Sequence, residues 1–274
     1  MEPAYADIVV AGRPQRLEYA WVCAARADAP VIVFLHEGLG SLAMWKGFPQ
    51  ALCTAAGARG LVFSRYGYGR SMSRPATEKW PVEFMHEQAE QVLPALFACV
   101  GLNRPAWLYG HSDGGSIALL YAAAFPERVA GVVAVAAHVF VEDVSVASIE
   151  AARAAYVATD LRQRLARYHA NPDSAFHGWN DIWLDPAFRG WNIEDCLPRI
   201  RCPVLAVQGE DDEYGTMAQV GAIARLVPRS RLLMLPACGH SPHRDQPAAL
   251  TAAIVGFLRE QHGAQVRSAT GTRV

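Results

Sequence analysis

The most constraining feature of this sequence is a glycine-rich turn between an apolar segment and a helical one. Residues 110–115 read Gly-His-Ser-Asp-Gly-Gly; they follow the apolar run 106–109 and open the helical stretch 116–125. Gly-x-Ser-x-Gly at a strand-to-helix junction is the spacing of a nucleophile elbow, where small residues leave room around a serine in strained geometry. The alternative is a plain turn that happens to contain a serine. The strand before and the helix after favour a nucleophile at Ser112.

Apolar runs alternate with helical stretches on both sides of this turn. Continuous β-branched and apolar runs at 30–35, 60–64, 129–137 and 203–208 are typical of strands buried on both faces of a parallel sheet. Helical stretches between them predict βαβ units with helices on both faces. The predicted helices cover 48–56, 82–100 (kinked at Pro94), 217–226 and 248–260. The remaining predicted strands are an edge hairpin, 7–10 and 17–24, and a last strand, 230–235.

The alternation stops between residues 138 and 199. This segment has no convincing strand, is helical in composition over 149–169 and is rich in aromatic residues. We interpret 138–199 as a helical cap inserted into a core made of 1–137 and 200–262. The polar residues 263–274 are predicted to form a disordered tail.

Composition narrows the class of protein. The chain has 274 residues, 52% of them hydrophobic, and a formal net charge of −1. Such a balance allows a large α/β core and indicates neither a nucleic-acid nor a membrane partner. No apolar run approaches the roughly 20 residues of a membrane span, and no secretory signal is evident. Six scattered cysteines fit reduced thiols, so we predict a cytoplasmic protein; the sequence makes no prediction of oligomeric state.

A serine nucleophile needs a base to take its proton and an acid to orient that base. The loops after the last two predicted strands carry the candidates, Asp212 and then His240. Because an open parallel sheet gathers its site at the carboxyl ends of its strands, we expect both to lie near Ser112. Asp211 and His243 are the alternatives in the same two loops.

An oxyanion hole needs two convergent N–H donors, and loss of one typically costs about 2.7–4 kcal/mol of barrier. The backbone of Asp113, directly after Ser112, is one candidate. Gly38, in the loop 36–41 after the first buried run, is the other. No cofactor and no metal site are predicted, because the histidine and carboxylate spacings lack a complete ligand set.

Taken in order, these pieces resemble α/β-hydrolase fold serine hydrolases over about residues 15–262. The resemblance rests on the loop 36–41, Gly-Tyr-Gly-Arg-Ser at 67–71, the elbow 110–115, Gly-Glu-Asp-Asp at 209–212 and Gly-His at 239–240. The Ser-Asp-Gly-Gly elbow is most similar to the valacyclovirase (biphenyl-hydrolase-like) group. The resemblance implies a mostly parallel sheet of about eight strands, a triad Ser112–Asp212–His240 and a cap over the pocket. It also favours Asp212 over Asp211.

The function this implies is hydrolysis of a carboxylic ester, or a related acyl bond, of a small molecule by water through an acyl-enzyme. A C–C bond or thioester hydrolase with the same triad is one alternative. A receptor-like ligand-binding protein with slow or no turnover is another. Chemistry that uses an aspartate nucleophile is disfavoured by the serine at position 112.

Aromatic side chains of the predicted cap are candidates to line the pocket, since large rings supply apolar binding area. These candidates are Phe140, Trp179, Trp183 and Trp191, and each of them could instead pack the cap onto the sheet. His138, the first residue of the cap, is placed with the substrate-binding candidates.

Two carboxylates bear on the charge of the substrate. In the resembled group the residue matching Asp113 holds an α-ammonium group, and Glu37 interrupts the usual His-Gly-x-x-Gly of the oxyanion loop. Together they would favour a cationic acyl group. Alternatively, Glu37 pairs with Arg65 or Arg70, and Asp113 stabilises its own helix N-terminus.

Overall fold

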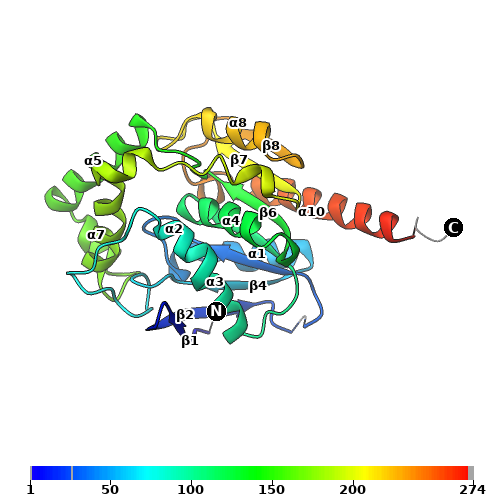
Figure 1. The fold of residues 1–274 in the computed structure, drawn as a ribbon, viewed down its shortest axis with the longest axis horizontal. Coiled ribbons are helices and arrows are strands. Elements are labelled where there is room, and N and C mark those ends of the chain that lie inside the picture. Colours follow the sequence, from blue (N-terminus) through cyan, green and yellow to red (C-terminus); the bar gives the residue numbers. More distant parts are fainter. Residues whose placement is uncertain (1, 26, 271–274) are drawn as a thin grey trace.

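Figure 1 shows the fold as a computed structural model, which describes residues 2–25 and 27–270. Eight strands form one sheet in the order β1-β2-β4-β3-β5-β6-β7-β8. The first two strand pairs, β1 with β2 and β2 with β4, are antiparallel, and every other neighbouring pair is parallel. The strands are β1 (Ala4–Val10), β2 (Arg13–Val22), β3 (Val31–Leu35), β4 (Arg59–Phe63), β5 (Ala106–His111), β6 (Val129–Val135), β7 (Val204–Gly209) and β8 (Ser230–Leu235). The predicted mostly parallel sheet with an edge hairpin is confirmed.

Helices cover both faces of this sheet (Figure 1). The α-helices of the described chain are α1 (Phe48–Ala56), α2 (Phe84–Glu87), α3 (Leu93–Cys99), α4 (Asp113–Ala124), α5 (Asp143–Ala158), α6 (Leu161–Leu165), α7 (Pro172–Trp183), α8 (Met217–Leu226), α9 (Pro242–Asp245) and α10 (Pro247–Thr270), of which α5, α6 and α7 belong to the segment 138–199. The core is accordingly divided in two. One apolar cluster joins one side of the sheet to α2, α3, α4 and α8, and the other joins the opposite side to α1 and α10.

The central strands are buried along their whole length. All five residues of β3 and all six of β5 are buried, as a strand covered on both faces requires. Their parallel pairing brings the ends of both strands to one edge of the sheet, with Leu35 opposite Gly110. The loops after β3 and β5 therefore start side by side.

The predicted helix 82–100 has an irregular middle. It consists of α2, a π-helical turn over Gln88–Val92 and α3. Pro94 has no N–H to donate to the preceding turn, and the wider π turn lies directly before it. The irregularity predicted at Pro94 is thus a π turn within a helix.

The segment 138–199 contains α5, α6 and α7 and contributes no strand to the eight-stranded sheet, although Phe140 and Asn192 form an isolated bridge. In Figure 1, α5 and α7 lie at the opposite end of the molecule from α10. The single helix predicted over 149–169 is interrupted after Ala158. There the hydroxyl of Thr159 donates to the Ala155 carbonyl and accepts from the Leu161 N–H, which replaces helical backbone bonding.

The last helix is longer than predicted. α10 continues to Thr270, ten residues past the expected end at Glu260, so residues 263–270 of the predicted tail are helical. Residues 271–274 of that tail lie outside the described residues. Within the described chain, no helix is both long enough and apolar enough to cross a bilayer.

Candidate active site

Ser112 lies at the junction of β5 and α4 in a conformation that few non-glycine residues adopt, with φ 53° and ψ −121°. The glycines two residues on either side permit it. A Cβ on Gly110 would lie 2.1 Å from the carbonyl oxygen of Gly114, and a Cβ on Gly114 would lie 2.1 Å from that of Leu35. The backbone is therefore strained and tightly packed around Ser112, which holds its hydroxyl in place.

His240 and Asp212 meet as the sequence predicts. The Nδ1 of His240 lies 2.8 Å and 3.0 Å from the two carboxylate oxygens of Asp212. Because a carboxylate accepts, Nδ1 carries the proton and donates it, which leaves the Nε2 lone pair free to accept. This is the tautomer that a general base opposite a serine hydroxyl needs.

The carboxylate of Asp212 is held in place by two further donors. The backbone N–H of Tyr214 donates to Oδ1 over 2.8 Å, and the side-chain amide of Gln208 donates to Oδ2 over 2.6 Å. Burial by itself raises the pKa of Asp212, but the hydrogen bond and charge of His240 and the Tyr214 N–H outweigh it, so the pKa is lowered. Asp212 is thereby kept as an anion.

The loop that carries His240 is anchored through its backbone. The N–H of His240 donates to the carboxylate of Glu213 over 3.1 Å, and its carbonyl accepts from Nε2 of His111 over 2.7 Å. His111 immediately precedes Ser112, so the elbow itself positions the histidine loop. The predicted alternatives lie elsewhere: the Asp211 side chain is exposed, and His243 packs against Trp45.

A cavity of about 280 Å³ joins Ser112 to His240. Its wall also contains Glu37, Gly38, Leu39, Met44, His111, His138, Ile149, Leu161, Leu165, Trp179, Trp183, Glu213, Tyr214, Ser241 and Arg244. The loops after β3, β5, β7 and β8 therefore meet α5, α6 and α7 around one hollow. Apolar side chains of the helical segment face the polar groups of the sheet edge.

Gly38 lies where its missing side chain matters. A Cβ at this position would overlap the Trp179 ring, 2.1 Å from Cδ1. The indole therefore packs directly on the loop after β3. In the described part of the chain, neither the N–H of Gly38 nor that of Asp113 donates to a backbone or side-chain acceptor. Both candidate oxyanion donors are therefore without an acceptor within the described residues.

The side chain of Asp113 is turned away from this cavity. It is fully buried, with Oδ2 3.5 Å from Arg65 Nη2 and Oδ1 accepting from the Trp183 indole N–H over 3.1 Å. Burial raises its pKa despite the opposing effect of Arg65 and Trp183. Asp113 is thus engaged in a buried contact between the elbow and α7, and it does not line the cavity.

Glu37, by contrast, lines the cavity wall. Its carboxylate lies 3.5 Å from Nδ1 of His111, while its backbone carbonyl accepts from Arg65 Nη2 over 2.9 Å. Burial raises the pKa of Glu37, but the neighbouring His111 outweighs that effect, and the pKa is lowered. The expected pairing with Arg65 is therefore through the Glu37 backbone, and the carboxylate faces a histidine.

The predicted aromatic candidates divide evenly. Trp179 and Trp183 line the cavity, as does His138, whose pKa is lowered by burial to about 3. Phe140 and Trp191 do not. The backbone N–H and carbonyl of Phe140 bond to the Gln219 side chain, and Trp191 stacks on Phe188.

Several residues that hold the site could not be chosen from the sequence. Gln208 precedes the acidic loop inside an apolar strand, and Glu213 is one of four consecutive acidic residues. Their roles depend on how the loops after β7 and β8 fold against each other. His111 was visible in the elbow motif, but nothing in that motif marks its bond to the His240 carbonyl.

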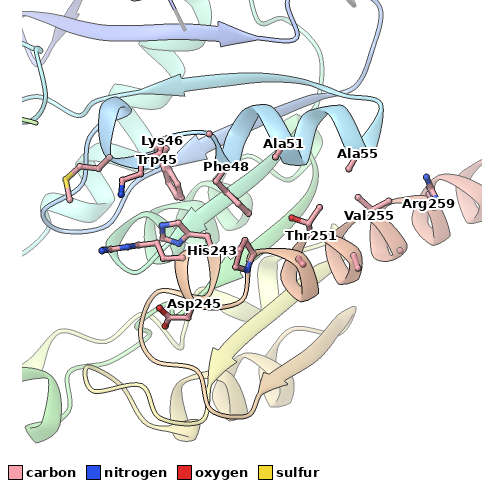
Figure 2. Close-up of a pocket in the computed structure, with 17 residues that line it drawn as sticks. Trp45, Lys46, Phe48, Ala51, Ala55, His243, Asp245, Thr251, Val255 and Arg259 are labelled. Carbon is pink, nitrogen blue, oxygen red and sulfur yellow. The ribbon is translucent and has the colours of Figure 1, made fainter.

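A larger groove, about 1170 Å³, lies between α1 and α10. Figure 2 shows it between α1, which carries Phe48 and Ala51, and α10, which carries Thr251 and Val255. It adjoins the smaller cavity at Met44 and Arg244 but contains neither Ser112 nor His240. The candidate catalytic residues Ser112 and His240 line the smaller cavity. Among residues 2–25 and 27–270, no cluster of three or more His, Cys, Asp or Glu side chains could hold a metal ion.

Comparison with known proteins agrees with this architecture. The model of the alpha/beta hydrolase family matches residues 32–254. The chain is 28% identical to the human serine hydrolase BPHL over 189 residues, 65% of this chain and 61% of that protein. It is also 28% identical to a putative carbamate hydrolase RutD of a Caulobacter species over 248 residues, 82% of this chain and 90% of the relative.

Solved structures resemble the whole chain. The crystal structure of VinJ superposes with a TM-score of 0.73 at 23% identity and covers 95% of this chain and 100% of its own. A thermophilic esterase from Thermogutta terrifontis superposes with a TM-score of 0.70 at 21% identity, covering 96% and 100%. At these identities the likeness shows the fold.

Proposed function

Because the chain belongs to the alpha/beta hydrolase family, we propose that it is a serine hydrolase that cleaves a carboxylic ester, or a related acyl bond, of a small molecule. The observation that carries the proposal is the hydrogen bond of His240 to Asp212 in a cavity shared with Ser112. Relatives named as serine hydrolase and as esterase/perhydrolase support this class of chemistry.

In the proposed reaction, Nε2 of His240 takes the hydroxyl proton of Ser112 as its oxygen attacks the acyl carbon. The N–H groups of Gly38 and Asp113 hold the oxyanion, and Asp212 stabilises the imidazolium. His240 then passes the proton to the departing alkoxide, and an acyl ester remains on Ser112. Water repeats the sequence with the same proton transfers, which releases the acid and restores the serine.

The cavity suits a small, largely apolar acyl group. Its polar groups gather at the sheet edge, while Ile149, Leu161 and Leu165 supply apolar surface opposite. We propose that 138–199 acts as a cap that excludes water from the acyl-enzyme. Any preference for a cationic acyl group then rests on Glu37, because the carboxylate of Asp113 is already paired with Arg65.

Two other functions make different predictions. A thioester or C–C hydrolase would use the same three residues with another leaving group, and a receptor-like protein would bind without turnover. The test is hydrolysis of a chromogenic short-chain acyl ester together with labelling by a fluorophosphonate probe, on wild type and Ser112→Ala. We expect labelling and turnover in wild type and neither in the variant. Ligand-dependent stabilisation without turnover would favour the receptor.

A further inference from the structure

One buried arginine has no carboxylate partner within the part of the chain that the structure describes. Arg74, in the loop between β4 and α2, is only 5% exposed. Its guanidinium reaches two carbonyl oxygens, those of Pro75 and Ser174, each over 3.4 Å, and its Nε has no acceptor. No carboxylate of the described chain lies within 4 Å of it. A buried cation without a counter-ion is unfavourable, so binding of an anion would stabilise this site.

Arg74 lines a cavity of about 450 Å³ between its loop and α7. The wall comprises Arg74, Ala76, Glu78, Lys79, Trp80, Asn171, Asp173, Ser174, His177, Gly178, Asp181, Ile182 and Asp185. This cavity shares no residue with the one at Ser112. Helix α7 separates the two, with Trp179 and Trp183 on the catalytic side and His177, Gly178 and Asp181 on this side.

The acidic residues of the wall are engaged elsewhere. Arg13 and the Tyr66 hydroxyl bind Glu78. Arg162 and the Tyr156 hydroxyl bind Asp173.

Asp181 pairs with Arg153, and Asp185 accepts from the Ala187 N–H at the start of a short helix. None of the arginines that neutralise these carboxylates lines the cavity itself. The wall therefore has two cationic side chains, Arg74 and Lys79. Against them stands Asp185, the one carboxylate of the wall that has no cationic partner in the described chain.

We propose that this cavity binds a small organic oxyanion, a carboxylate or a phosphate ester, with the guanidinium of Arg74 as its principal contact and Lys79 at its mouth. Guanidinium presents several donors in a planar fork that matches both oxyanions. A volume of about 450 Å³ accommodates more than a bare ion.

The site joins two parts of the molecule. The backbone N–H of Arg74 donates to the hydroxyl of Ser174 over 3.1 Å, and that hydroxyl donates back to the Arg74 carbonyl over 3.2 Å. Ser174 lies in α7, which also carries the two tryptophans of the catalytic cavity. An anion at Arg74 is thus bound between the core and α7, and its binding should raise the melting temperature.

The test is calorimetric titration of the full-length chain carrying Ser112→Ala, which removes turnover, with sodium phosphate and separately with sodium succinate. Sodium chloride at equal ionic strength is the reference. We expect saturable binding of at least one oxyanion at one site. Arg74→Gln should weaken its affinity about tenfold or more, because the charge-assisted hydrogen bonds are lost.

Lys79→Glu is a second variant, and because Lys79 is exposed the fold should tolerate the substitution. It should weaken anion binding several-fold and leave the melting temperature measured without anion unchanged. Lys46→Glu, at the chain's other lysine and outside this cavity, is the matched control and should bind as before. Stronger phosphate binding would identify a phosphate ester, and stronger succinate binding a carboxylate. Absence of saturable binding by either, or binding that both Arg74→Gln and Lys79→Glu leave intact, would overturn the proposal.

Discussion

The loops at the strand ends and the helical segment 138–199 both line the cavity at Ser112, but their residues are positioned by different means. Ser112, Gly38 and Asp212 follow strand ends within three residues, and the backbone N–H groups of Ser112 and Asp212 bond to the carbonyls of Val135 and Gly209. Trp179 and Trp183 are placed by how α7 packs against the loop at Gly38 and the elbow at Asp113. The loops at the strand ends thus position their residues accurately, whereas side chains of 138–199 can be substituted without disturbing the strands. We therefore expect substitutions at the strand ends to affect kcat and substitutions in α7 to affect substrate preference.

Among the residues around Ser112, the largest expected effect is at Asp212. Asp212→Asn removes the charge that stabilises imidazolium and allows the wrong His240 tautomer, so kcat should fall on the order of 10⁴-fold, the effect of the same change in a serine protease. Asp211→Asn, one residue earlier and exposed, is the matched control and should keep nearly full activity. Steady-state kinetics on a chromogenic ester measure both. A reversed result would move the acid of the triad to Asp211.

The buried contact of Asp113 with Arg65 and Trp183, between the elbow and α7, should contribute to the free energy of unfolding. Asp113→Asn leaves the Arg65 guanidinium, 3% exposed, without its carboxylate, and loss of one partner of a buried pair typically costs about 3–5 kcal/mol. Asp143→Asn, at an exposed pair with Arg189, should cost little. Urea denaturation gives the free energy of unfolding of both.

The same variant tests the charge of the substrate. A benzyl ester with an α-amine and its methyl analogue should be cleaved by Asp113→Asn in the wild-type ratio, because Asp113 does not face the cavity. A ratio that changes in Asp113→Asn and stays constant in Glu37→Gln would contradict the geometry described for these two carboxylates.

Buried histidines should make the protein sensitive to acid. Burial lowers the pKa of both His138 and His243 to about 3, below the unfolded value of about 6.5. The unfolded chain therefore binds more protons between these limits, and stability is lost as the pH falls from about 6.5, by about 1.4 kcal/mol per pH unit for each group. Unfolding free energies between about pH 7.5 and 5 measure this slope.

His243→Gln should reduce that slope by one group's share. Equal slopes in wild type and His243→Gln would show that His243 is not the neutral buried group described above.

The smallest effect is expected at the tryptophans of the helical segment. Trp179 and Trp191 are 7% and 5% exposed, but only Trp179 lines the cavity. Trp179→Leu should shift the ratio of kcat/KM for long and short acyl esters by about tenfold, the worth of one or two methylenes in a pocket. Trp191→Leu should lower the melting temperature and leave that ratio alone. A preference that both variants alter equally would remove the distinction between the two rings.

These differences explain what the sequence could predict. The strands, the elbow and the two loops that carry Asp212 and His240 follow from local patterns, because parallel strands end at one edge and their loops are short. The choice of Asp212 over Asp211 rests on the resemblance to the family. The orientation of Asp113 does not follow, since it depends on Arg65 and Trp183, distant in sequence. For the same reason Phe140 and Trp179 are indistinguishable as sequence, and only the packing of α7 separates them.

The central claim is that His240 and Asp212, in the loops at the strand ends, activate Ser112 as a nucleophile. Trapping the acyl-enzyme tests this claim most directly. Wild-type protein is mixed with a p-nitrophenyl ester, quenched in acid within the first turnovers, and analysed by peptide mass spectrometry. We predict one acyl group per chain, on the peptide that contains Ser112, and none in Ser112→Ala, whose turnover should be abolished. An acyl group on another residue, or undiminished turnover in Ser112→Ala, would contradict the account.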